Sequence, residues 1–138
     1  MYNKIGFVDI IIDVNGLYPQ ATLKEVDSRL KALEGANRYA KVATTTTAAT
    51  LIRGSGATSV ERLTDGVYKV VFIDSVAECG WIATLNNNDD GTVESGEIGV
   101  EQADEFEPNA LWVRTFNSAA GFEEDIDDGD GFTVHVIC

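Results

Sequence analysis

The feature that most constrains this chain is a series of short segments after residue 51 in which apolar and polar residues alternate. In GVYKVVFI, residues 66–73, Tyr68, Val70 and Phe72 fall on one face of an extended chain. Similar segments occupy residues 57–63, 80–85, 96–102, 110–116 and 131–138, with Gly, Asn, Asp or Pro in the loops between them. Six short strands of this kind predict a mainly β chain, with an antiparallel β-sandwich or jelly-roll-like head over residues 51–138.

Residues 20–36 have the pattern of a short α-helix with a heptad repeat. Thr22, with Glu25 three residues later, is typical of a capped helix start, and Gly35 is typical of a helix end. The apolar positions follow the spacing of a coiled-coil seam: Leu23, Val26, Leu30 and Leu33. Because two heptads are too short to be stable alone, we expect this helix to associate with copies of itself. The alternative is a groove in its own domain.

Two further segments complete the predicted organisation. Residues 1–19 are expected to form an N-terminal β segment, because residues 7–14 alternate and one face is wholly apolar through Val8, Ile10 and Ile12. That face must be buried, so we predict that it joins the helix in an oligomer interface. Residues 37–50, which contain four consecutive threonines, are predicted to be a Thr-rich linker or an edge strand.

The charge of the chain excludes some classes of partner. Asp and Glu number 23 against 10 Lys and Arg, which gives a net charge of −13. Nucleic acid is therefore not expected as a partner, because binding the phosphate backbone requires a basic patch. No run of 18 apolar residues is present, so membrane insertion is not expected, and the first residues do not have the pattern of a signal peptide.

The chain has two cysteines, Cys79 and Cys138. Their spacing is not that of a CxxC or Cys/His metal motif, so they are either a structural pair or two unrelated thiols. A disulfide between them would close a long loop and stabilise the fold by about 4 kcal/mol. Such a bond would require an oxidising compartment.

Two stretches carry a resemblance to known proteins. YNKIGFVDIIIDVNGLYP, residues 2–19, resembles the closing strands of a repeat in secreted and surface proteins of bacteria. The second resemblance is to an uncharacterised β domain that follows such repeats. It rests on GVYKVVF, the cysteine in the following segment, VRTF and the final apolar residues before the last cysteine. The resemblance implies an extracellular or cell-surface β domain with Cys79 and Cys138 paired and no known enzyme activity. A short helix before a β head is also similar in architecture to trimeric fibre heads.

Calcium is the one cofactor that the sequence indicates. NNNDDGTVESGE has the ligand spacing of an EF-hand loop, with Gly91 in sixth place and oxygen-bearing residues at Asn86, Asn88, Asp90, Thr92, Glu94 and Glu97. A second acidic loop offers Asp125, Asp127, Asp128 and Asp130. The segments on both sides of the first loop read as strands and not as helices. The alternative is therefore an ordinary hairpin turn rich in Asn, Asp and Gly.

No catalytic residues are predicted. His135, the single histidine, lies inside the last predicted strand, and no serine lies in a G-x-S-x-G motif. The carboxylates crowd into loops, where they stay solvated and ionised. Trp81 and Trp112 could form a platform for a sugar ring, but their place in alternating strands favours packing.

The sequence thus predicts a non-enzymatic, extracellular structural protein. It is expected to self-associate as a trimer or filament through its N-terminal strand and helix and to display a β head. A head that binds ligands, such as glycans, in a calcium-dependent way is the alternative, and an acidic hydrolase is a remote one.

Overall fold

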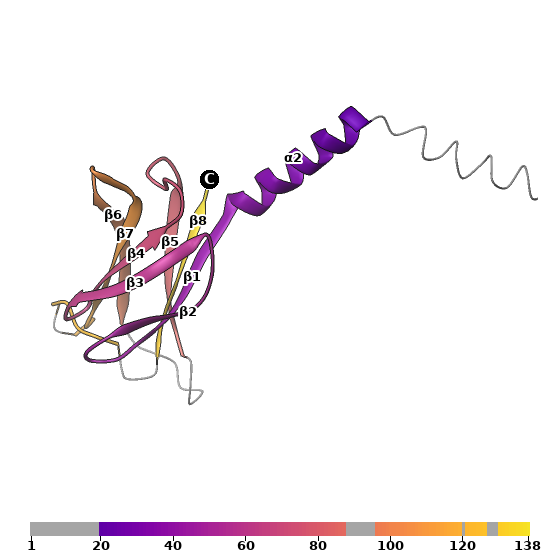
Figure 1. Cartoon of the computed structure of the whole chain (residues 1–138). Helices are drawn as coiled ribbons and strands as arrows, with labels where there is room; N and C mark the ends of the chain where they lie inside the picture. Colours follow the sequence, from indigo (N-terminus) through magenta and orange to yellow (C-terminus); the bar gives the residue numbers. More distant parts are fainter. Residues whose placement is uncertain (1–19, 88–95, 120, 127–129) are drawn as a thin grey trace, which may run out of the picture. The chain divides into compact units, whose positions relative to one another are not determined.

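The computed structural model describes residues 20–87, 96–119, 121–126 and 130–138 (Figure 1). The chain divides into two compact units at the boundary between Gly35 and Ala36. The described part of the first unit is almost all of helix α2 (Gln20–Ala36), and the second unit, called the head below, contains every described strand.

Helix α2 covers the predicted range 20–36, but it begins two residues before the predicted cap at Thr22 and continues through Gly35. It is rich in Leu, Lys, Glu and Arg, which lose little side-chain freedom in a helix. Lys31 forms an ion pair with Asp27 one turn earlier, with 2.7 Å between Nζ and Oδ2. Both side chains are exposed, so the pair adds only about 0.3–0.5 kcal/mol to helix stability. Among the described residues, no helix has the length and apolar character needed to cross a membrane.

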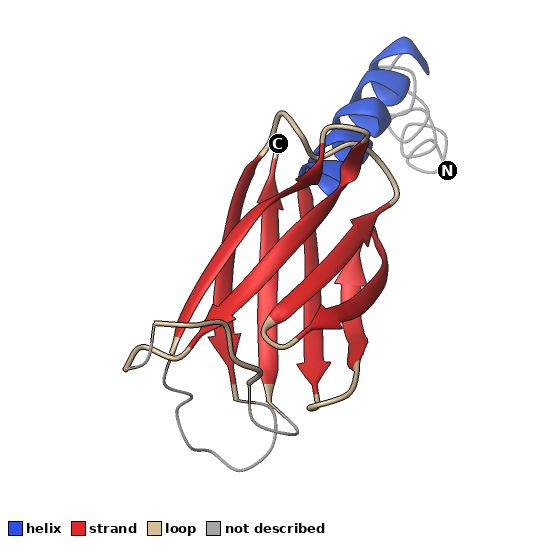
Figure 2. Ribbon diagram, turned by 90° about the vertical axis from the view of Figure 1, so that its left-hand side faces the viewer, coloured by secondary structure: helices blue, strands red, loops and turns tan. Residues whose placement is uncertain are grey.

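The head is mainly β, as predicted, and consists of two four-stranded antiparallel sheets (Figures 1 and 2). Sheet A has the strand order β2-β1-β8-β5, and sheet B has the order β3-β4-β7-β6. The eight strands are β1 (Asn37–Thr44), β2 (Ala49–Ser55), β3 (Ala57–Thr64), β4 (Val67–Phe72), β5 (Gly80–Asn86), β6 (Glu97–Asp104), β7 (Glu107–Phe116) and β8 (Gly131–Ile137). All six strands that the sequence predicts after residue 51 are present.

The structure corrects the prediction for residues 37–50. Residues 37–44 form β1, which lies inside sheet A between β2 and β8, while residues 49 and 50 begin β2, an edge strand of that sheet. Ala40, Val42 and Thr44 are fully buried on the inner face of β1. Their small size hid the alternation in the sequence, since Ala and Thr are weak signals of a buried face.

The core lies between the two sheets, as in a β-sandwich. The ring of Tyr68 on β4 packs against the ring of Phe132 on β8, with 5.2 Å between the centroids. Fully buried residues of the four inner strands surround this contact: Ala40, Val42, Val70, Phe72, Leu111, Val113, Val134 and Val136. Each such large apolar side chain contributes about 1.5–3 kcal/mol on burial.

The edges of the two sheets meet at both sides of the sandwich. β2 runs almost directly into β3 through Gly56, whose φ of 70° places it in the left-handed region that favours glycine. On the other side, β5 is in contact with β6. In space the last four strands follow the order β8-β5-β6-β7, in which the last strand of the chain lies beside the first of the four. This is the strand order of a Greek key.

A disulfide between Cys79 and Cys138 confirms the pairing that the resemblance implied. It joins the turn before β5 to the residue after β8, where the two strands are paired through Gly80 and Ile137. The cysteines are 59 residues apart in sequence, and their Cα atoms are 4.5 Å apart. Closing a loop of this length stabilises the folded chain by about 4 kcal/mol through the entropy of the unfolded state.

Gly131 provides a test of the close approach between β8 and β1. A Cβ atom at this position would lie 1.8 Å from the carbonyl oxygen of Val42. We expect Gly131→Ala to lower the free energy of unfolding by about 3 kcal/mol, because the backbone of β1 must move. The control is Gly99→Ala on β6, where a Cβ meets no atom within 4 Å. Equal urea midpoints for the two variants would contradict the packing described.

Candidate functional site

A polar cluster around Asp125 joins the segment before β8 to the β3–β4 hairpin. Arg62 on β3 donates from Nε to Oδ1 of Asp125 at 3.0 Å and from a terminal nitrogen to Oδ2 at 2.5 Å. The backbone N–H of Gly66 donates to the same Oδ1 at 2.8 Å, and the hydroxyl of Tyr68 does so at 3.0 Å. The Arg62 and Asp125 side chains are only 15% and 12% exposed. The cluster therefore fixes a long loop to the head.

The role of Asp125 differs from the one that its sequence context predicts. We expected its carboxylate to be a free calcium ligand in a solvated loop, but both of its oxygens accept hydrogen bonds from protein donors. An ion would have to replace the Arg62 guanidinium to reach them. The physical reason is that a partly buried carboxylate is stable only when it is paired.

The pKa values in the cluster follow from these contacts. Burial alone would raise the pKa of Asp125, but hydrogen bonds from Arg62, Gly66 and Tyr68 outweigh it and hold the pKa below its ordinary value. Burial, and then the neighbouring carboxylate, raises the pKa of Tyr68 to about 12. The hydrogen bond to Asp125 raises the pKa of Arg62 above its ordinary range. The pair therefore stays ionised and Tyr68 stays protonated at neutral pH.

We expect Asp125→Asn to lower the free energy of unfolding by about 2 kcal/mol at neutral pH, because charge-assisted hydrogen bonds are lost. The pKa of Asp125 is depressed in the folded chain. Its contribution to the free energy of unfolding is therefore complete above the pKa of the unfolded chain and is lost as the pH falls through the folded pKa. The difference between wild type and variant should accordingly shrink in acid. Urea unfolding at several pH values measures this.

Asp65→Asn is the matched control for that experiment. Asp65 also accepts from Arg62, at 2.6 Å, but its side chain is 80% exposed. Its removal should change the free energy of unfolding by less than about 1 kcal/mol. An effect as large as that of Asp125→Asn would show that the buried contacts are not the stabilising ones.

The other predicted ligands of the second acidic loop are not gathered in the described residues. Asp130 is 4% exposed, and its backbone carbonyl accepts from the N–H of Thr44 at 2.8 Å and from the Thr44 hydroxyl at 3.3 Å. Asp127 and Asp128 lie outside the described residues. Within residues 20–87, 96–119, 121–126 and 130–138, no three His, Cys, Asp or Glu side chains form a group that could hold a metal ion.

The first predicted calcium loop is bounded by strands, since β5 ends at Asn86 and β6 begins at Glu97. The side-chain amide of Asn86 donates to the hydroxyl of Thr133 on β8, and Glu97 is exposed. The remaining predicted ligands lie outside the described residues: Asn88, Asp90, Thr92 and Glu94. Calcium binding by this loop therefore stays a prediction.

Thermal unfolding with calcium and with a chelator tests that prediction. An ion that binds only the folded chain raises the melting temperature by mass action. We expect the rise to disappear in Asp90→Asn, because this removes a charged ligand from the loop. Identical melting temperatures in calcium and chelator would exclude the site.

The two tryptophans do not form a shared platform for a sugar. Trp81 on β5 is half-buried against the core, and its indole N–H donates to the carbonyl of Val76 at 2.8 Å. Trp112 on β7 belongs to sheet B and points outward, because its neighbours Leu111 and Val113 are buried. The guanidinium of Arg114 lies 5.4 Å from the centre of its ring. The two tryptophans therefore lie on different sheets, Trp81 against the core and Trp112 on the outer face.

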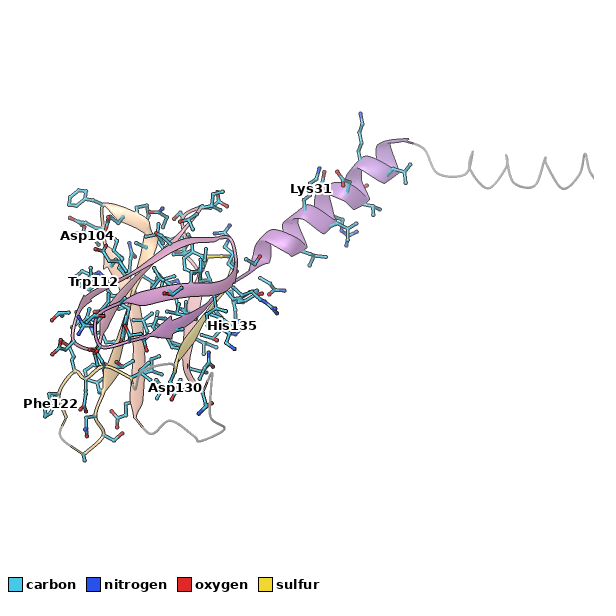
Figure 3. The ribbon with its side chains drawn as sticks, turned by 60° about the horizontal axis from the view of Figure 1, so that its bottom comes forward. Lys31, Asp104, Trp112, Phe122, Asp130 and His135 are labelled. Atoms are coloured by element: carbon cyan, nitrogen blue, oxygen red, sulfur yellow. A yellow bond between two sulfur atoms is a disulfide. The ribbon has the colours of Figure 1, made fainter. Side chains whose placement is uncertain are left out.

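His135 lies inside β8, as the sequence predicts, and its side chain is on the exposed face of that strand. Its ring stacks on that of Tyr39 on β1, with 6.0 Å between centroids and 26° between planes. Figure 3 shows His135 and Trp112 on opposite sides of the head. The sequence gives no sign of this stacking, because the two residues are brought together only by the pairing of β1 with β8.

Several residues of the Asp125 cluster were also missed at the level of sequence. Arg62 and Tyr68 each lie in a predicted strand, about 60 residues before Asp125. Gly66 lies in the turn between β3 and β4, and nothing in that turn sequence indicates that its N–H binds a distant carboxylate.

The predicted seam of α2 is exposed in the single chain. Leu23, Val26, Leu30 and Leu33 are 56%, 48%, 53% and 66% exposed, respectively. The other predicted interface residues, Val8, Ile10 and Ile12, lie outside the described residues. Of the residues predicted to form the oligomer interface, the structure describes only these four on α2.

The fold and contacts define a mainly β domain of two four-stranded sheets with one disulfide, preceded in sequence by a helix. Comparison with known protein families, with curated proteins and with solved structures finds no match to this chain. The resemblance to bacterial surface proteins therefore stays a prediction.

Proposed function

We propose that this chain is a non-enzymatic structural protein that self-associates through α2 and displays the head. The observation that carries the proposal is the exposure of all four seam residues, each between 48% and 66%, at a and d positions of one helix. Exposed Leu and Val at regular spacing are unfavourable in water, and burial against copies of the same helix removes that cost.

The order of residues along the seam supports more than two strands. Leu23 and Leu30 take the a positions, and Val26 and Leu33 take the d positions. With Leu at a, a β-branched residue at d favours trimers or tetramers, as Val26 does, whereas Leu33 at the other d position is also compatible with a dimer. We therefore propose a trimer as the basic unit, with the N-terminal segment around Val8, Ile10 and Ile12 as a second contact between copies.

The disulfide supports an extracellular or cell-surface location. Bonds of this kind form and persist in oxidising compartments. In the cytosol, glutathione would keep Cys79 and Cys138 reduced, and the head would lose about 4 kcal/mol of stability.

Leu30→Asp tests the proposal. A charge in the middle of the seam cannot be buried without a partner, so the helices should separate and the assembly should sediment with a lower mass than the wild type. Ser28→Asp is the control, because Ser28 lies on the same helix outside the seam and is also exposed. This control should sediment like the wild type. A Leu30→Asp variant that keeps the wild-type mass while remaining folded would contradict the proposal.

A further inference from the structure

The four strands of sheet A contain no Asp or Glu, although the chain has 23 of these residues. The strands of sheet B, in contrast, carry carboxylates on β3, β6 and β7. In a chain of net charge −13, an outer sheet face with no carboxylate from its own strands is the place where another acidic molecule can approach with the least repulsion.

Sheet A also carries two cations that form no ion pair with any residue that the structure describes. Lys41 on β1 and Arg53 on β2 lie directly opposite one another, and neither forms an ion pair within the described residues. Like charges in this position destabilise a sheet. The third cation of sheet A, Arg38, is paired with Asp74. On sheet B, all three basic residues contact at least one carboxylate: Arg62, Lys69 and Arg114. A carboxylate from outside would relieve the repulsion on sheet A.

An apolar row lies beside these cations. The strand register places Ile82, His135 and Tyr39 side by side across β5, β8 and β1. Ile82 and the nearby Ile137 are 54% and 57% exposed. A shallow hollow of about 420 Å³ lies over these four side chains. An apolar centre beside unpaired charges is the composition of a protein interface.

We infer that the outer face of sheet A docks the acidic outer face of sheet B from a second copy of this chain. Glu61 on β3 and Glu97 on β6 lie on the outer face of sheet B, and neither forms an ion pair within the described residues. They lie on the two edge strands of sheet B, so either one of them, but not both at once, can face the neighbouring cations Lys41 and Arg53. Contact between two copies of sheet A would instead bring cations against cations.

The geometry of this contact determines the type of assembly. The docking surfaces are the opposite outer faces of one head, so the contact is head-to-tail and not two-fold symmetric. Such contacts form rings where the rotation closes and open filaments where it does not. Opposite faces favour stacking into a filament. The inference rests on the proposed self-association and extends it from the helix to the head.

The test compares full-length variants by sedimentation velocity over a wide range of protein concentration. Lys41→Gln with Arg53→Gln should lower the association constant of the heads about tenfold, equivalent to about 1.4 kcal/mol. Ile82→Ser should also weaken association, and because Ile82 is exposed the head should stay folded. The control is Ser59→Glu with Thr64→Glu on the exposed side of β3, which changes the net charge by the same amount.

The control separates specific docking from general repulsion. Both pairs of substitutions make the chain more acidic, but only the change on sheet A removes cations from the docking surface. We expect the control to associate at least as strongly as the wild type. Equal weakening by both pairs would overturn the inference, as would a wild type that sediments as a monomer at every concentration.

Each set of substitutions is also measured in a chain that carries Leu30→Asp. This comparison separates docking through sheet A from association through the helix. Association that persists in Leu30→Asp and is lost when Lys41 and Arg53 are also replaced supports docking through sheet A. Dissociation by Leu30→Asp with no effect of the sheet A substitutions supports the helix seam alone and overturns the inference. Loss of association on replacing the cations, with no effect of Leu30→Asp, supports the inference and overturns the seam.

Discussion

The structure of the head depends on the pairing of its last strand. β8 lies inside sheet A, where it pairs with β1 on one side and β5 on the other. Its inner residues, Phe132, Val134 and Val136, face the core. Gly131 lets its backbone approach Val42 closely, and Cys138 fastens its end to the turn before β5. The sandwich cannot close before the C-terminal residues arrive, so folding depends on contacts of long sequence separation.

The two sheets differ in how their charged side chains are paired. On sheet B and its loops, cations are matched with carboxylates, most fully where Arg62 meets Asp125. On sheet A, Lys41 and Arg53 form no ion pair with any described residue and lie beside an exposed apolar row. Since proteins of high net charge repel one another, such asymmetry directs where copies can meet. The seam of α2 and the outer face of sheet A are the two surfaces of the described chain on which the proposed assembly rests.

Patterns within a few residues predicted much of this protein. Alternation predicted the six strands after residue 51, and heptad spacing predicted a helix at α2, although Gly35 lies inside that helix and does not end it. β1 and β2 were harder to predict, because small Ala and Thr side chains mark a buried face weakly. For the site, the acidic loops were visible, but the partner of Asp125 was not. A carboxylate has the same sequence signature whether it binds an ion, a water molecule or an arginine 63 residues away.

Local sequence by itself determined the mainly β class, the positions of most strands and the exposed seam of the helix, because these follow from side-chain periodicity along a short stretch of chain. Only the tertiary structure decided that β1 is an inner strand, that Arg62 and Tyr68 bind Asp125, and that Lys41 lies against Arg53. These are relations between residues on different strands. They depend on register and sheet order, which the packing of the two layers sets and which no single segment encodes.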